Sequence, residues 1–478
     1  MTTIDTLPDE VLLGIFDVFR VSRTDFELRH KPVWNWHILI HVCRRWRQIV
    51  FGSPLRLDLQ LLCTRKTPVR KNLGCWPAFP IVIDYDNGQP FSYDSSFEDD
   101  VIAALENPSR VRHIKLSVTN SFWIKLAPLM QESFPVLTSF SIRSLERNVF
   151  LFPSRFLGGS APCLRELRFH GMPTHASPIL LSPASNLVSL VLFDCDTTQN
   201  GHISPAALVT GLAMLPRLNN LSIAFGSWAQ TDHWQIYPLP KTRVVLPALN
   251  SFSFDGASIF LEDFVSRIDT PMLNSIEITY IDFTGTPIPQ LSEFLKRSAL
   301  KPSRFRDAKI YFDDGDEILV FVGPGGDPEE FPIAYHITSC EGIYDQVSCM
   351  AEVLIHTSTM LSNVVRLEIR SEELWRLDDE DEDLDRIDWL ELLRPFTAVE
   401  TLQVSQEFSE MVAHALEEMP AETANQVLPA LNLLLLEGEP MESDEKLVAT
   451  LRDRDCPLPS RPLTVMRYEG PVPKFEND

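Results

Sequence analysis

Apolar residues form two helical stripes within the first 50 positions of the chain. The first stripe recurs at spacings of one and three, which is typical of one face of an amphipathic helix; it consists of Val11, Leu12, Ile15, Phe16 and Phe19. Thr6, Pro8 and Asp9 supply start signals that place the beginning of this helix near Leu7. The second stripe consists of Leu39, Val42, Cys43, Trp46 and Ile49. Two helices this short cannot bury both faces against each other, so we expect them to need a partner surface.

A different pattern fills most of the remaining chain, in which an apolar-x-x-apolar-x-apolar unit recurs. The units begin at Val111, Leu137, Leu164, Leu187, Leu218, Leu249, Leu273, Phe305, Val364, Val399 and Leu431. The pattern alone arises often by chance, but six units open with Pro-x-Leu, where composition predicts about one. This excess indicates a repeat.

Helix-like stretches lie between the repeated units. They are 204–215, 259–268, 290–297, 344–360 and 408–419. Strands that alternate with helices are expected to be parallel, and units too small to bury their own apolar faces stack into a curved solenoid. The interval between the units at Phe305 and Val364 is longer; 318–322 and 331–337 within it predict a hairpin or a decayed repeat. A non-repeating α/β domain is the alternative.

The N-terminal segment resembles the F-box, a helical module that docks on the Skp-type adaptor of cullin-based ubiquitin ligases. The match includes Leu7-Pro8, the residues that follow it, and Val42-Cys43, Arg45-Trp46 and Ser53-Pro54-Leu55. The resemblance implies that Leu7, Pro8, Val11, Leu12, Ile15, Phe16, Val42, Cys43, Trp46 and Ile49 contact the adaptor. The stretch 21–35 is longer than the usual link in this family. An N-terminal helical hairpin packed on the following domain is the alternative.

The repeated units are similar to leucine-rich repeats, in the degenerate form that follows the F-box in fungal F-box proteins. The Asn or Cys that usually follows the strand occurs only as Cys195. The two resemblances together imply an α/β chain with an F-box helical module at 1–60, a linker at 61–80, and an irregular leucine-rich-repeat-like solenoid with a curved parallel sheet at 81–470.

Charge is unevenly distributed along the 478 residues. The formal net charge is −24, yet 31–71 holds nine bases and one acid, net +8, which leaves −32 for the remainder. The acidic body argues against nucleic acid as a partner, whereas the basic segment can meet an acidic partner, such as the adaptor that the F-box resemblance implies. Nucleic acid is the less favoured alternative for this segment. The eight cysteines are scattered and predict reduced core residues of an intracellular protein, cytoplasmic or nuclear. The start of the chain lacks a signal peptide, and no apolar run spans a membrane.

Alternate slots of the predicted strands should line an exposed sheet that holds a protein target. Most of these slots carry small polar residues. Arg168, His170, Val191, Phe193 and Ser222 are the candidate target-binding residues, because Val191 and Phe193 are apolar where neighbouring slots are polar. Packing under a loop is the alternative for these two residues. For the loop aromatics Trp228, Trp234 and Tyr237 we favour packing over recognition.

The acidic stretch 372–388 is similar to a calcium loop in the spacing of Asp381, Asp383 and Asp385, but Arg386 and Leu392 occupy the positions that need glycine and glutamate. It therefore predicts a solvated acidic loop and no metal site. The sequence contains no catalytic or cofactor-binding motif, so we expect neither enzymatic activity nor a cofactor. The expected function is that of a substrate receptor in an SCF-type ubiquitin ligase; the alternative is a solenoid interaction scaffold that directs no ubiquitination.

Overall fold

The structure is a computed structural model of the whole chain, and it forms two compact units, Met1–Glu166 and Leu167–Asp478. The residues described are 4, 7–21, 36–64, 67, 69–70, 73–74, 76–85, 97–146, 152–171, 181, 184–193, 204–225, 242–281, 283, 287–313, 317–325, 331–338, 343–371, 387–417, 427–437, 442–452 and 463–468. The stretch 22–35, Cys195, the loop aromatics Trp228, Trp234 and Tyr237, and 372–386 lie outside them.

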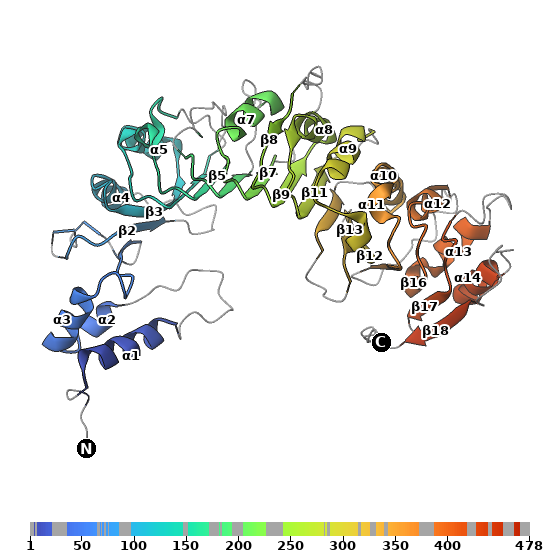
Figure 1. Cartoon of the computed structure of the whole chain (residues 1–478), viewed down its shortest axis with the longest axis horizontal. Coiled ribbons are helices and arrows are strands. Elements are labelled where there is room, and N and C mark those ends of the chain that lie inside the picture. Colours follow the sequence, from blue (N-terminus) through green and yellow to red (C-terminus); the bar gives the residue numbers. More distant parts are fainter. Residues whose placement is uncertain are drawn as a thin grey trace. The chain divides into compact units, whose positions relative to one another are not determined.

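The first unit begins with three helices, α1 (Asp9–Val21), α2 (His37–Ile40) and α3 (Arg44–Gly52) (Figure 1). The first predicted stripe lies within α1, but only Leu12 and Phe16 of its described side chains are buried. The second stripe is not one helix: it is divided between α2 and α3, because the backbone of Cys43 is extended (φ −156°, ψ 171°). The Phe16 ring packs edge-on against Trp46 with centroids 4.8 Å apart. α1 carries Asp9 and Glu10 in its first turn, where acids stabilise a helix, and Cys43 caps α3 by accepting from the backbone N–H of Trp46 at 3.4 Å.

Strands follow the helices within the first unit. They are β1 (Leu61–Cys63), β2 (Ile81–Tyr85), β3 (Val111–Val118) and β4 (Ser139–Ser144), parallel and adjacent in that order. The helical segments between and after them are α4 (Glu98–Leu105), α5 (Asn120–Leu126), η3 (Leu129–Gln131) and η4 (Phe156–Gly159). Segment 61–80, predicted as a linker, thus contains a strand of the sheet. A strand of three residues is too short to show a period in the sequence.

Trp36 joins the helices to the first strands. Its side chain is 1% exposed, and its Nε1 donates to the carbonyl oxygen of Gln60 at 2.9 Å. Its ring packs edge-on against Trp76 and Phe79, with centroids 5.2 and 5.5 Å away. Such aromatic pairs add stability beyond the area they bury, so the segment before β2 is held on the helices by packing.

The second unit contains one large sheet. Its strand order is β5 (Glu166–His170), β6 (Ser189–Phe193), β7 (Asn220–Ala224), β9 (Ser251–Gly256), β11 (Ser275–Ile281), β14 (Ile333–Thr338), β13 (Glu317–Gly323), β12 (Asp307–Asp313), β15 (Arg366–Ser371), β16 (Thr401–Val404), β17 (Leu433–Glu437) and β18 (Thr464–Tyr468). All eleven predicted repeat strands, in both units, are present within two residues of their expected starts. A separate pair, β8 (Val244–Val245) with β10 (Ile268–Asp269), lies outside this sheet.

Helices alternate with these strands, as the sequence predicts. They are α7 (Pro205–Leu212), α8 (Ser258–Ser266), α9 (Pro289–Arg297), η6 (Pro302–Arg304), α10 (Ile343–His356), α11 (Ser358–Leu361), α12 (Ile387–Leu393), η7 (Gln406–Phe408), α13 (Ser409–Glu417) and α14 (Glu442–Arg452). In Figure 1, α7, α8 and α9 lie along the same side of β7, β9 and β11. The apolar slots of the strands face these helices and form the core, which confirms an α/β fold with a large parallel sheet.

Burial along the strands follows the predicted alternation with one difference. Leu167, Leu190, Leu221 and Leu402 are at most 1% exposed, as expected. Ser222 and Ser253, expected to be exposed, are half-buried. Neighbouring strands lie about 4.8 Å apart, so side chains in the same slot cover one another. Among the cysteines described, Cys63 is buried but Cys163 is exposed, because it occupies the middle of a Pro-x-Leu turn.

The long interval between repeats is a hairpin. β13 and β14 are antiparallel to each other, and β12 is antiparallel to β13. β14 pairs in parallel with β11, and β12 pairs in parallel with β15. Three strands therefore occupy the place of one strand in the regular repeat. From β12 to β15 the pairing is parallel again.

Candidate protein-docking surfaces

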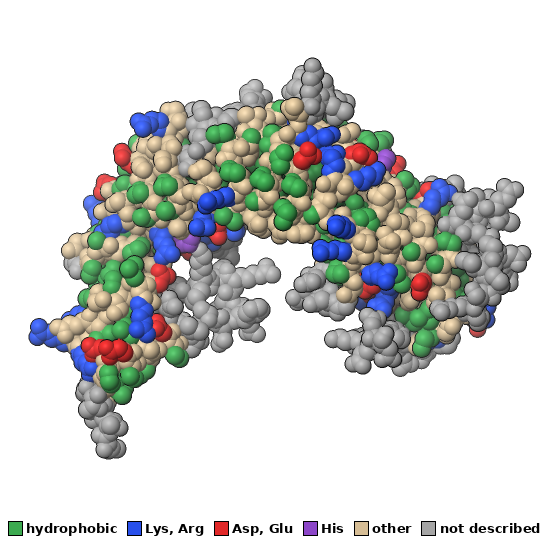
Figure 2. Space-filling model, in the orientation of Figure 1, with side chains coloured by type: hydrophobic (Ala, Val, Ile, Leu, Met, Phe, Trp, Pro, Cys, Tyr) green, Lys and Arg blue, Asp and Glu red, His purple; other side chains and the backbone are tan. Residues whose placement is uncertain are grey.

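Helix α1 presents apolar side chains on two faces. Leu12 and Phe16 are buried, while Val11, Ile15 and Val18 are 45%, 42% and 67% exposed. The exposed three are spaced by four and three residues, so they lie along one stripe of the helix. We call Val11, Ile15 and Val18 the α1 stripe. Figure 2 shows hydrophobic side chains at the surface of this helical region, between acidic and basic ones.

The residues predicted to bind an adaptor divide between the interior of the helices and their surface. Leu12, Phe16 and Ile49 are buried; Leu7, Cys43 and Trp46 are half-buried; Pro8, Val11, Ile15 and Val42 are exposed. Val18 and Ile38 are also exposed apolar residues, and the sequence analysis missed both. Val18 follows Val11 by seven residues, so the helical period could have revealed it.

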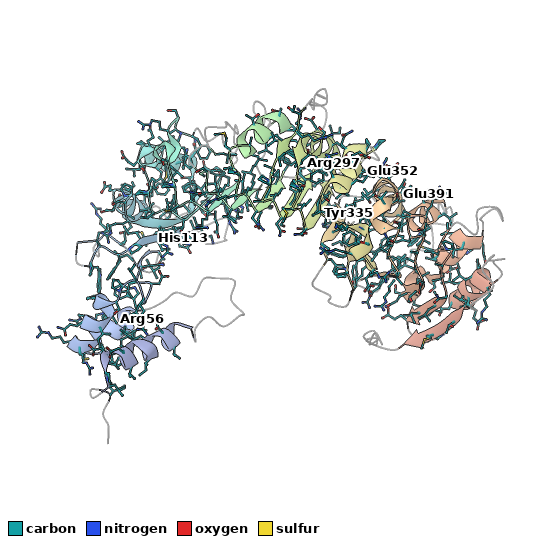
Figure 3. All side chains as sticks on the ribbon, viewed as in Figure 1. Arg56, His113, Arg297, Tyr335, Glu352 and Glu391 are labelled. Atoms are coloured by element: carbon teal, nitrogen blue, oxygen red, sulfur yellow. The ribbon has the colours of Figure 1, made fainter. Side chains whose placement is uncertain are left out.

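Charged side chains fasten α1 to α3 and the turn after it. Arg45 lies 2.6 Å from Asp9 and also donates to the carbonyl oxygen of Leu7. Arg56, labelled in Figure 3, lies 2.9 Å from Asp17. Two cations of the basic segment are thus neutralised within the helices, whereas Arg44 is exposed.

The candidate target-binding residues lie on three successive strands of the second unit. Val191 of β6 is directly paired with Ser222 of β7, and the rings of His170 and Phe193 lie 5.5 Å apart across β5 and β6. Arg168 is exposed, Phe193 is 47% exposed, and the other three are half-buried. The fold brings all five onto one face of the sheet, because they occupy alternate positions of adjacent parallel strands.

The hairpin adds ionisable groups to this face that the sequence analysis did not single out. His336 of β14 lies 2.9 Å from Glu317 of β13. Burial raises the pKa of Asp255 on β9 to about 6, although the nearby His336 acts in the opposite direction. Pairing of β11 with both β9 and β14 brings Asp255 and His336 together, and only the strand order reveals that neighbourhood.

A second set of charged side chains lies on β12 and β15, next to the hairpin. Glu368 of β15 is buried and lies 3.5 Å from Lys309 and 3.0 Å from Arg370. Asp307 lies 3.6 Å from Arg366, and burial raises the pKa of its carboxyl. These pairs satisfy charges within the sheet face. No group of metal-ligating side chains is found in the described part of the chain.

Comparison with known proteins gives matches among solved structures. No protein-family model and no curated protein matches the sequence. Among solved structures, the chain is similar to the leucine-rich repeat-containing protein LegL7 from Legionella pneumophila, at 11% identity and a TM-score of 0.27, over 82% of this chain and 97% of that one. We base the class of the fold on the strand pairing itself, which defines a leucine-rich-repeat-like α/β array. None of the helices in the described ranges is both long and apolar enough to cross a membrane.

Proposed function

We propose that this chain is a substrate-receptor subunit of an SCF-type ubiquitin ligase, in which α1 to α3 bind a Skp-type adaptor and the sheet of the second unit binds a protein target. The observation that carries the proposal is the α1 stripe: three apolar side chains stay exposed on a helix whose opposite face is already buried. Exposed apolar clusters of this kind mark interaction sites. The F-box resemblance, which includes Val11 and Ile15 but not Val18, supports a Skp-type adaptor as the partner.

The proposed set of adaptor-binding residues is therefore smaller than the set that the sequence predicted. Pro8, Val11, Ile15 and Val42 are accessible to a partner and contact it directly. Leu12, Phe16 and Ile49 act from inside, because they hold α1 and α3 in place. The chain itself performs no chemistry in this role. It brings the target near the ubiquitin carrier and raises the effective concentration of the target's lysines.

The experiment is a binding measurement between the full-length chain and a purified Skp-type adaptor. Val11→Asp with Ile15→Asp places two charges in the α1 stripe and should weaken binding at least about 100-fold, because desolvated apolar anchors dominate such interfaces. Ile124→Asp on α5 is the matched control, since Ile124 is 65% exposed but lies outside the three helices. An unmodified chain that does not bind the adaptor would refute the proposal.

A second measurement distinguishes a substrate receptor from a scaffold that directs no ubiquitination. The adaptor complex is combined with a cullin and the ubiquitin-transfer enzymes, and proteins captured by the chain are tested for ubiquitination. A receptor supports transfer onto a captured protein, and the Val11→Asp, Ile15→Asp variant does not. Adaptor binding without any transfer indicates a scaffold.

A further inference from the structure

A pocket of about 570 Å³ opens at the edge of the second unit's sheet where β11 and β14 begin. Its walls include Leu300, Phe305, Phe331 and Pro332, and its two charged lining residues are Lys301 and Arg304. Pockets of this volume with apolar walls and a few polar groups are the usual form of small-ligand sites.

The pocket follows from the inserted hairpin. In a regular repeat the connection after a strand crosses to the adjacent strand, about 4.8 Å away. Here the connection from β11 through α9 and η6 crosses to β12, which lies three strand positions away because β14 and β13 stand between them. The connection therefore spans about 14 Å. The hollow beneath it is closed by Pro324 and Phe331 from the ends of the hairpin strands.

The two cations flank a short helix at the mouth of the pocket. η6 is a 3-10 helix over Pro302–Arg304 with Lys301 as its N-cap, and the backbone N–H of Arg304 donates to the carbonyl oxygen of Lys301 at 3.0 Å. Both residues line the pocket, so their side chains border the same hollow. Both are exposed. In Figure 2, Lys and Arg side chains lie beside hydrophobic ones in the region of β11 to β13.

No acid pairs with these cations among the described residues, and no acid is part of the described pocket lining. The cations of the preceding helix, α9, differ because each has an acidic partner. In α9, Lys296 lies 2.8 Å from Glu293, and Arg297 lies 2.8 Å from Asp269. Within the described part of the chain, two cations with no ion-pair partner therefore place positive charge at the mouth of the pocket.

The apolar wall is held in position by its neighbours. Phe305 is 1% exposed and Leu300 is 6% exposed, so both are anchored in the core. The Phe331 ring packs against Phe321 with centroids 5.8 Å apart, and Lys309 Nζ lies 5.5 Å from the Phe331 centroid. These side chains therefore give the pocket an apolar wall of fixed position.

We propose that this pocket binds an organic phosphate with an apolar, ring-sized body. The phosphate pairs with Lys301 and Arg304, and the apolar body lies against Phe305 and Phe331. A phosphate monoester fits better than a carboxylate, because its charge near −2 matches two cations and its three oxygens accept from both. The same chemistry can come from a free small molecule or from a phosphorylated aromatic side chain of a partner protein. The site is separate from the proposed adaptor contact, so it is tested on the chain alone.

The test measures binding of 1-naphthyl phosphate to the full-length chain by calorimetry at low salt. We expect a dissociation constant below about 1 mM, and at least tenfold weaker binding of 1-naphthol and of inorganic phosphate. Lys301→Gln with Arg304→Gln should weaken 1-naphthyl phosphate binding at least about tenfold. Arg165→Gln with Arg217→Gln removes the same charge from exposed arginines in other repeat turns and should leave binding unchanged.

A second variant tests the cavity rather than the charge. Ala299→Phe keeps both cations and fills the pocket, so it should also abolish binding of 1-naphthyl phosphate. Thermal melting of each variant checks that the chain is folded. Equal binding of 1-naphthol and 1-naphthyl phosphate, or unchanged binding by either pocket variant, would overturn the proposal.

The source of the phosphate is decided with a phosphotyrosine peptide and its unphosphorylated form. Binding of the phosphopeptide but not of its unphosphorylated form, lost in the Lys301→Gln, Arg304→Gln variant, supports the proposal and assigns the pocket to a protein partner. Binding of 1-naphthyl phosphate without binding of the phosphopeptide supports the pocket and assigns it to a free small molecule.

Discussion

The guanidinium of Arg45 lies 2.6 Å from Asp9 Oδ1 and joins the first turn of α3 to the first turn of α1. The pair neutralises Arg45 within the helices, although the residue belongs to the basic segment 31–71. Arg44, its neighbour in sequence, remains exposed. Two adjacent arginines therefore have different roles, and a salt series can distinguish them.

Replacing Arg44 by Gln should slow association with an acidic adaptor about two- to threefold at low salt and flatten its salt dependence, because exposed charges steer encounter. The difference should vanish as salt rises, since screening acts over about 10 Å at roughly 0.1 M. Stopped-flow association across a salt series measures it. Arg45→Gln is the matched comparison: it loosens α1 from α3 and should accelerate dissociation instead. Equal effects of both changes on the association rate would contradict this assignment. Retention of the chain on random oligonucleotides would instead favour nucleic acid as the partner of the basic segment.

Leu221→Ala should lower the free energy of unfolding by about 2 to 5 kcal/mol, because Leu221 is 1% exposed and its truncation leaves a cavity. Ser222→Ala, one position along β7, should change it by less than about 0.5 kcal/mol. Denaturant titration of both variants gives the comparison. A large effect at Ser222 would mean that the half-buried hydroxyl supports the sheet and is not available to a target.

Glu262 should make the stability of the second unit fall as pH rises. Its carboxylate accepts from the backbone N–H groups of Gln290 and Leu291 at 2.7 and 2.8 Å, at the start of α9, yet burial raises its pKa from 4.5 to about 7. The folded chain therefore binds more protons than the unfolded chain between those values. The contribution is present below pH 4.5 and is lost as pH rises through 7, by at most about 3 kcal/mol.

Denaturant titration from pH 4.5 to 8, on the unmodified chain and on Glu262→Gln, isolates this contribution. The half-buried Asp255 has a pKa raised to about 6 and acts in the same direction, so the difference between the two proteins is the informative quantity. That difference should shrink as pH rises. A constant difference over this range would exclude titration of Glu262.

Gly158 and Gly159 form a matched pair for backbone strain. Both have positive φ, 66° and 73°, which costs an L residue roughly 1 kcal/mol. An added Cβ at Gly158 would lie 2.8 Å from the backbone Cα and N of Ser133, whereas at Gly159 nothing lies within 4 Å. Gly158→Ala should therefore destabilise the first unit clearly more than Gly159→Ala, measured by thermal melting. Equal losses would show that the Ser133 backbone moves aside without resistance.

The repeat strands were predictable because each has its own local pattern. Leu221 and Leu402 are buried in parallel strands as expected, since the period of two and the Pro-x-Leu turns are properties of contiguous residues. Helix α1 was predictable for the same reason. The exposure of individual residues was not: Leu12 and Val11 are neighbours on the same predicted stripe, but Leu12 is buried and Val11 is 45% exposed.

The sequence by itself determined the alternation of strand and helix, the first N-terminal helix and the positions of the turns, because these depend on spacings of a few residues. The tertiary structure decided which residues meet across long separations. It ordered β14 and β13 between β11 and β12, brought Asp255 beside His336, and paired Arg45 with Asp9. The physical reason is that strand order, burial and charge pairing depend on how segments far apart in the chain share one core, and no local period records that arrangement.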